Sequence, residues 1–159
     1  MLNSNWSFPS IKKIPSRVIR YKNILIGITI VWYPIMGSNI IVIDDDVGTA
    51  LFFKICLEDE GHQVSIFNDP SSLLEEFEPG IYDLLITDIR MPRINGFELA
   101  SRIRRMDSKI RICLATAFEE YYQSIIKSYT DLSFNCIIRK PINKDNFLEI
   151  VENRLKQTK

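Results

Sequence analysis

The chain has 159 residues, of which 46% are apolar and 25% charged, a composition typical of one ordinary globular domain. Its formal net charge of zero conceals an asymmetry: residues 1–37 carry five basic side chains and no acid, which leaves 15 basic against 20 acidic residues in 38–159. A mildly acidic domain of this kind is a poor nucleic-acid binder, because phosphate backbones are held by several Lys or Arg on one face. Arg102, Arg104 and Arg105 lie close in sequence, but a helix spreads them around its circumference, and we interpret them as a solvated face.

Residues 1–37 form an N-terminal extension distinct from a domain at 38–159. Its basic residues precede a mostly apolar run at 24–36, which is shorter than the roughly 20 apolar residues that a bilayer span needs. No small-x-small cleavage site follows the run, which disfavours a cleaved export signal. Met36 lies just before the first apolar strand pattern of the domain. Two interpretations therefore stay open: a mis-assigned start codon, with translation from Met36, or a membrane-associating anchor in residues 1–35.

The remaining chain alternates short apolar runs with segments of helical periodicity. Predicted strands cover 39–43, 63–67, 82–87, 111–115 and 135–139, and predicted helices cover 47–60, 71–78, 95–106, 119–129 and 143–156. Asp69 is the expected N-cap of the second helix, with Pro70 in its first turn. Five strands alternating with five helices predict an α/β fold, a doubly wound parallel sheet with right-handed crossovers.

Polar signals follow four of the predicted strands. They are Asp44-Asp45-Asp46 after the first strand, Asp88 after the third, Thr116-Ala117 after the fourth and Lys140-Pro141 after the fifth. The carboxyl ends of parallel strands meet at one edge of the sheet, where ligands bind. We therefore expect carboxylates, a hydroxyl and an ammonium group to share one pocket suited to a divalent cation and a phosphoryl group.

These signals, in this order, resemble the receiver domain of two-component response regulators over about residues 38–157. Thr87 to Leu99 is one of the resembling stretches, and the part from Asp88 to Gly96, Asp-Ile-Arg-Met-Pro-Arg-Ile-Asn-Gly, is the most specific single piece. The resemblance implies a flavodoxin-like, five-stranded sheet with strand order 2-1-3-4-5.

The resemblance also implies roles for the residues of the pocket. Asp88 would be the phosphoacceptor, and Lys140, Thr116 and the backbone amide of Ala117 would contact phosphoryl oxygens. Mg²⁺ would be ligated by Asp45, Asp88 and the backbone carbonyl of Arg90, with Asp44 acting through water. The Lys140–Pro141 peptide bond would be cis. The crowded carboxylates would raise each other's proton affinity until a cation binds.

The function implied is that of a stand-alone cytoplasmic receiver. It would take its phosphoryl group from a histidine kinase or phosphotransfer protein and signal through a downstream effector protein. It would be a phosphoacceptor with self-catalysed, Mg²⁺-dependent transfer and autodephosphorylation rather than an enzyme. Membrane contact is expected only if residues 1–35 are present.

Several positions depart from the receiver pattern. Ile137 stands where the family usually has an aromatic switch residue, which leaves open a pseudo-receiver that acts as an interaction module without phosphorylation. We interpret Tyr121, Tyr122, Tyr129 and Phe134 as packing residues. Arg90 and Phe118 are large residues two positions beyond Asp88 and Thr116, from which we expect slow autodephosphorylation. Arg90 also stands where phosphatases of the haloacid-dehalogenase type carry their second acid, which disfavours that class.

The cysteines and the single histidine give no further signal. Cys56, Cys113 and Cys136 have no CxxC spacing, so we expect neither a zinc site nor a disulfide, and a reduced protein. Cys113 is expected to be a small core residue. His62 lies in a helix stop without neighbouring ligands, and we expect no catalytic or metal role for it.

Overall fold

The computed structural model describes residues 20–26, 29–35, 37–117 and 135–157. The elements in these ranges are β1 (Arg20–Ile26), β2 (Thr29–Ile35), β3 (Asn39–Ile43), α1 (Val47–Asp59), β4 (Gln63–Phe67), α2 (Pro70–Glu76), β5 (Leu84–Asp88), α3 (Gly96–Met106), β6 (Arg111–Thr116), β7 (Ile137–Arg139) and α5 (Lys144–Lys156). The predicted helix at 119–129 lies outside the described residues.

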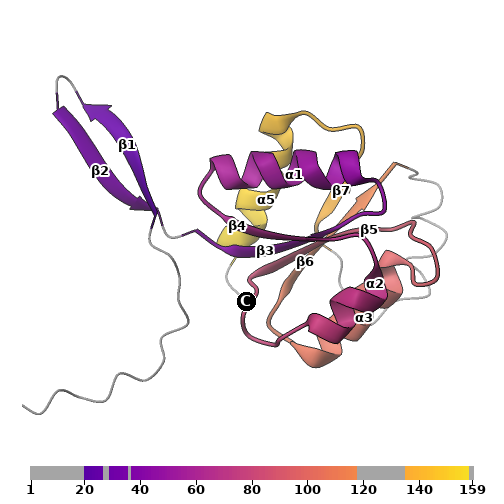
Figure 1. Cartoon of the computed structure of the whole chain (residues 1–159). Helices are drawn as coiled ribbons and strands as arrows, with labels where there is room; N and C mark the ends of the chain where they lie inside the picture. The colour runs from indigo at the N-terminus through magenta and orange to yellow at the C-terminus, as the bar shows by residue number, and fades with distance from the viewer. Residues whose placement is uncertain (1–19, 27–28, 36, 118–134, 158–159) are drawn as a thin grey trace, which may run out of the picture.

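Strands β3 to β7 form one parallel sheet in the order β4-β3-β5-β6-β7 (Figure 1). Numbered from the first strand of the domain, this is the predicted order 2-1-3-4-5, which is confirmed. Consecutive parallel strands need a crossover, and α1, α2 and α3 supply those that join β3, β4, β5 and β6. The order reverses beside β3, so the carboxyl ends of β3 and β5 flank the point where ligands bind in such sheets.

Helices cover both faces of the sheet, α1 and α5 on one side and α2 and α3 on the other (Figure 1). Alternate residues of β3 serve the two faces, because successive side chains of a strand point to opposite sides. Ile40 and Val42 pack with Phe53 and Phe147, whereas Ile41 and Ile43 pack with the other helices. The strands are apolar on both faces for this reason, and the polar residues of the site are confined to the strand ends.

Each described helix begins at a side chain that accepts a hydrogen bond from the first turn. These caps are Asp46 for α1, Asp69 for α2, Asn95 for α3 and Asn143 for α5. The predicted cap at Asp69, followed by Pro70, is confirmed. Such caps satisfy amide groups that have no partner within the helix.

The N-terminal extension contains a feature that the sequence analysis missed. β1 and β2 pair antiparallel as a separate two-stranded sheet, from Arg20 opposite Ile35 to Ile26 opposite Thr29. In the described part of the chain, no helix is both long enough and apolar enough to cross a bilayer.

The expectation about the cysteines was wrong, because Cys113 and Cys136 form a disulfide. Leu114 of β6 pairs with Ile137 of β7, so the preceding residues are also neighbours, with their Cα atoms 4.6 Å apart. The register of β6 and β7 brings the two cysteines together, and the spacing of the cysteines in the sequence does not reveal it. Cys56 is a free, buried thiol, and burial raises its pKa.

Candidate functional site

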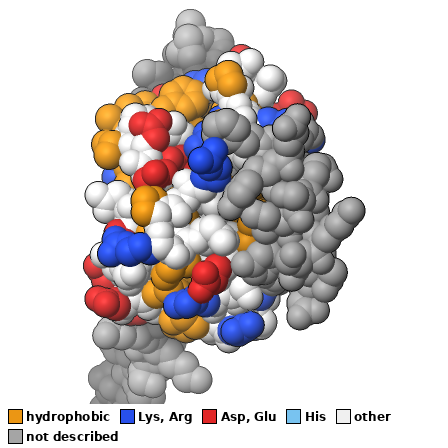
Figure 2. Space-filling view, turned by 90° about the vertical axis from the view of Figure 1, so that its right-hand side faces the viewer, with side chains coloured by type: hydrophobic (Ala, Val, Ile, Leu, Met, Phe, Trp, Pro, Cys, Tyr) orange, Lys and Arg blue, Asp and Glu red, His pale blue; other side chains and the backbone are white. Residues whose placement is uncertain are grey.

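A cavity of about 330 Å³ lies at the carboxyl edge of the sheet. Its lining consists of Asp44, Asp45, Asp46, Asp88, Arg90, Thr116, Ala117 and Lys140. Every side chain predicted for the site is therefore brought to one place, from the ends of β3, β5, β6 and β7. Figure 2 looks onto the side of the molecule that is on the right in Figure 1, where acidic and basic side chains lie close together.

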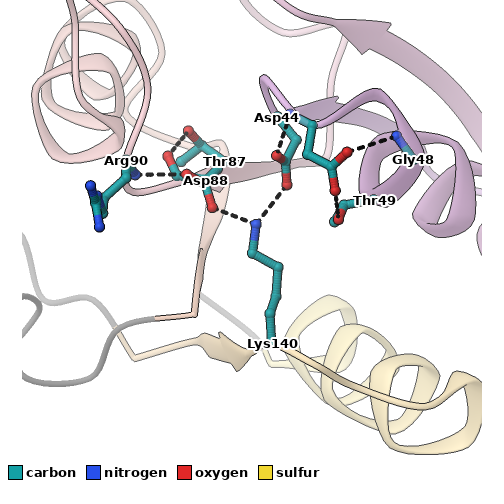
Figure 3. Close-up of polar contacts among 8 residues, drawn as sticks. Asp44, Gly48, Thr49, Thr87, Asp88, Arg90 and Lys140 are labelled. Atoms are coloured by element: carbon teal, nitrogen blue, oxygen red, sulfur yellow. Dashed lines mark hydrogen bonds and ion pairs between the residues drawn. The ribbon is translucent and has the colours of Figure 1, made fainter.

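Lys140 connects the acidic strand ends. Its Nζ donates to Asp44 Oδ2 at 2.9 Å and to Asp88 Oδ1 at 2.5 Å, and Figure 3 shows it reaching between the two carboxylates. Burial lowers the pKa of Lys140, but the hydrogen bonds and charges of both aspartates outweigh it, and the net pKa is raised. The ammonium group is therefore held in its charged form. The predicted cis peptide bond between Lys140 and Pro141 is confirmed.

Asp88 is the last residue of β5 and is 6% exposed. Burial raises its pKa and the negative charge of Asp44 adds to this, while Lys140 and the Arg90 amide lower it, with a net upward shift. Its Oδ2 accepts from the Arg90 N–H at 2.7 Å, so both carboxylate oxygens are oriented. The carboxylate is thus fixed in direction and is electrostatically costly to keep ionised.

Asp44, Asp45 and Asp88 each bring a carboxylate oxygen within 4.8 Å of the others. Asp44 and Asp88 are buried and Asp45 is exposed. Oxygen donors in such a cluster suit a hard divalent cation such as Mg²⁺, which usually keeps several waters. The three carboxylates are opposed by one ammonium group, Lys140, so the charge and the donor chemistry of the cluster both fit a divalent cation.

Asp46 has a different task from its two neighbours. Its Oδ1 accepts from the Gly48 N–H at 3.1 Å and its Oδ2 from the Thr49 hydroxyl at 2.6 Å. These bonds lower the pKa of Asp46. Helix capping thus accounts for Asp46, whereas Asp44 and Asp45 belong to the carboxylate cluster with Asp88.

Gly96 is a residue of the site that the sequence reasoning did not single out. Its N–H donates to Ile89 O at 3.0 Å, and a Cβ at this position would overlap the carbonyl oxygen of Asp88. The start of α3 therefore lies directly against the backbone of Asp88. The only sequence signal is a glycine eight residues after the end of β5, and it also fits an ordinary turn.

Thr116 lies on β6, the strand beside that of Asp88, and Ile137 lies on β7, the next strand along the sheet. Thr116 is 4% exposed and ends β6, and its backbone oxygen accepts from the Lys140 N–H at 2.8 Å. Ile137 begins β7 and packs, partly buried, on the α2/α3 face. Phe118, Tyr121, Tyr122, Tyr129 and Phe134 lie outside the described residues.

His62 lies away from this site, at the turn between α1 and β4. Its Nδ1 accepts from the Ser38 N–H at 3.1 Å, and its Nε2 lies 3.0 Å from Glu152 Oε1. The ring joins the start of β3 to α5, which gives His62 a structural task.

The model of the response regulator receiver domain family matches residues 40–152. An uncharacterized 14.6 kDa protein of Leptolyngbya boryana is 32% identical over 118 residues, covering 72% of this chain and 87% of that protein. The transcriptional regulatory protein DltR of Streptococcus agalactiae is 28% identical over 120 residues, covering 76% of this chain but only 53% of DltR. The chain thus spans about half the length of that relative.

Solved structures show the same fold. The receiver domain of a sensor histidine kinase from Pseudomonas aeruginosa, which has a magnesium ion coordinated in its active-site cleft, matches with a TM-score of 0.64 and 19% identity. That match covers 76% of this chain and 99% of the other.

Proposed function

This chain belongs to the response regulator receiver domain family, and on that premise we propose that it is a stand-alone receiver that accepts a phosphoryl group on Asp88. The donor would be a histidine kinase or a phosphotransfer protein, and the output would pass to an effector protein through a surface that depends on phosphorylation. The observation that carries the proposal is the buried Asp88 carboxylate, oriented by Lys140 and the Arg90 amide beside two further acids.

The chemistry asked of Asp88 is nucleophilic attack on phosphorus. One carboxylate oxygen forms the new bond to phosphorus, while the bond from phosphorus to the donor's imidazole nitrogen breaks and the imidazole keeps the electron pair. Phosphoryl transfer depends mainly on positioning and charge neutralisation. The hydrogen bonds to the Asp88 oxygens provide positioning. Lys140 would pair with the Asp88 carboxylate before transfer and with a phosphoryl oxygen after it.

Mg²⁺ is the cofactor proposed for this site. Asp45, Asp88 and the backbone carbonyl of Arg90 would hold it, with Asp44 acting through water. The bound ion would supply neutralisation of phosphoryl charge. The cluster of Asp44, Asp45 and Asp88 oxygens and its shortage of positive charge support this assignment.

Thr116 and Ala117 complete the proposed phosphoryl site. The Thr116 hydroxyl would bond one phosphoryl oxygen, and the Ala117 amide another. Thr116 is joined through its backbone to Lys140, so a change at the end of β6 would reach β7. Such a local electrostatic event can bias a two-state surface.

The receiver unit is proposed to be residues 38–159, acting in the cytoplasm, with residues 1–37 as an extension. Membrane contact would require residues 1–35. A second candidate function is the pseudo-receiver, for which the observation is Ile137 at the position of the aromatic switch residue.

Intact mass spectrometry of the full chain after incubation with acetyl phosphate tests the proposal. We expect a gain of one phosphoryl group that requires Mg²⁺ and is lost in Asp88→Asn. Asp59→Asn, an exposed acid on the far end of α1, is the matched control and should be modified like the wild type. A folded protein that gains nothing from acetyl phosphate or from a phosphohistidine donor would favour the pseudo-receiver.

A further inference from the structure

A second cavity of about 330 Å³ lies at the opposite, amino edge of the sheet. Its lining consists of Arg104, Ser108, Lys109, Ile110, Arg111, Asn135, Arg154 and Gln157. Three guanidinium groups meet there from separate elements: Arg104 in the last turn of α3, Arg111 at the start of β6 and Arg154 in the last turn of α5. The sequence analysis expected Arg104 to lie on a solvated face, whereas in the structure it lines this cavity.

The hydrogen bonds of these three arginines go to neutral oxygens. Arg104 donates to Ser108 O at 3.1 Å, Arg111 to Gln157 O at 3.3 Å and Arg154 to Gln157 Oε1 at 2.9 Å. Within residues 37–117 and 135–157, no salt bridge joins any of the three to a carboxylate. In the same ranges, the buried Nε atoms of Arg111 and Arg154 have no hydrogen-bond partner.

The cavity is therefore short of negative charge. Burial lowers the pKa of Arg154, and the positive charges of Arg104 and Arg111 lower it further. Burial also lowers the pKa of Arg104, which the nearby Asp107 partly offsets. The Asp107 carboxylate itself accepts from the amides of Gly80 and Lys109 at 2.9 and 2.8 Å.

Helix electrostatics explain only part of this arrangement. Cations are favoured at helix C-termini, which accounts for one arginine at the end of α3 and one at the end of α5. Arg111 belongs to a strand, however, and the helix dipoles give no reason for two buried Nε–H groups without acceptors. Unsatisfied buried donors cost free energy unless a partner is supplied.

We propose that this cavity binds a multiply charged oxyanion of the phosphate type. Guanidinium groups offer paired N–H donors that match phosphoryl oxygens, and such charge-assisted bonds are among the stronger ones in proteins. A dianion or a more highly charged group offsets three neighbouring cations better than a single carboxylate does. The ligand is either free phosphate or the phosphoryl groups of a larger molecule, for which pyrophosphate serves as the probe.

The test is a titration of the full chain carrying Asp88→Asn, in EDTA, with sodium phosphate and separately with sodium pyrophosphate. Both are compared with sodium chloride at matched ionic strength, by calorimetry and by NMR of the arginine Nε–H groups. We expect saturable binding of at least one probe, with shifts at Arg111 and Arg154. Tighter binding of phosphate identifies the free ion, and tighter binding of pyrophosphate identifies a larger phosphorylated ligand.

Variants decide whether the cavity is responsible. Arg154→Gln removes one charge and its donors and should weaken binding by about tenfold, the loss expected for one charge-assisted hydrogen bond. Arg102→Gln is the control, because Arg102 lies on α3 but is exposed and paired with Glu98, and it should bind like the parent. Arg154→Lys keeps the charge and serves if the glutamine variant unfolds; it should bind between the two. No saturable binding, or equal affinity in the Arg102 and Arg154 variants, would overturn the proposal.

Discussion

The two edges of the sheet carry opposite charges. At the carboxyl edge, the carboxylates of Asp44, Asp45 and Asp88 surround one ammonium group. At the amino edge, the guanidinium groups of Arg104, Arg111 and Arg154 meet neutral oxygens. The formal net charge of zero therefore describes neither edge. Each edge concentrates one sign and is suited to a ligand of the other, a divalent cation at one and an oxyanion at the other.

Loss of Lys140 should disturb the acidic edge most, because its ammonium group bridges the carboxylates of Asp44 and Asp88. Lys140→Ala leaves two buried carboxylates without their cation, and removing one partner of a buried pair costs about 3–5 kcal/mol. Urea unfolding without metal at neutral pH should show a loss of that size, reduced by Mg²⁺. Lys144→Ala removes an exposed ion pair with Asp59 and is the control, with no measurable change expected. Equal stability of the two variants would contradict the role given to Lys140.

Removing the disulfide tests how much the link between β6 and β7, which run from one edge of the sheet to the other, contributes to the free energy of unfolding. Cys113 and Cys136 are 23 residues apart, and closing a loop of that length stabilises a fold by about 3 kcal/mol. Urea unfolding with and without a reductant should show this difference. Cys136→Ser should show no such difference, whereas Cys56→Ser should retain it. Alkylation of the unfolded, unreduced protein should label Cys56 alone; labelling of all three cysteines would show that the bond is absent.

Gly96 tests how closely the acidic edge depends on the packing of α3. Gly96→Ala places a methyl group on the carbonyl oxygen of Asp88, and such overpacking costs about 1–3 kcal/mol. The variant should also accept phosphoryl groups more slowly. Gly48→Ala is the control, since its methyl group meets the Asp46 side chain at 3.4 Å. Stability and phosphorylation rates would be compared for both variants, and an unchanged Gly96 variant would mean that the backbone at Asp88 is not constrained.

The smallest expected effect concerns pH at the acidic edge. The pKa of Asp88 is raised in the fold, chiefly by burial. Its ionised form therefore disfavours folding, and this penalty is absent below the unfolded pKa and grows as pH rises toward the folded pKa. Asp88→Asn should stabilise the metal-free protein at neutral pH, and the gain should shrink as pH falls from the folded pKa toward the unfolded pKa and be absent below it. Urea midpoints across that range measure it, and a variant less stable than the wild type at neutral pH would contradict the direction of the shift.

Much of the acidic edge could be predicted because its signals are local in sequence. A polar residue that directly follows a buried strand must lie at the carboxyl edge of a parallel sheet, so the sequence alone places Asp44, Asp88, Thr116 and Lys140 there. The helix cap at Asp69 followed in the same way from a residue type and its neighbour.

The features that were missed depend on relations between distant segments. Arg104, Arg111 and Arg154 converge only because α3, β6 and α5 meet at one edge, and Cys113 meets Cys136 only through the register of β6 and β7. The pairing of β1 with β2 had a sequence signal, two apolar runs rich in Ile on either side of Gly27, which also fits the anchor interpretation.

The most direct test of the central claim is to locate the phosphoryl group chemically. The full chain would be incubated with acetyl phosphate and Mg²⁺, reduced with borohydride, which converts an aspartyl phosphate to homoserine, and digested for peptide mass spectrometry. We expect homoserine at position 88 and no conversion at Asp44, Asp45 or Asp46. Homoserine at one of those three positions, or none in a folded, Mg²⁺-bound protein, would contradict it.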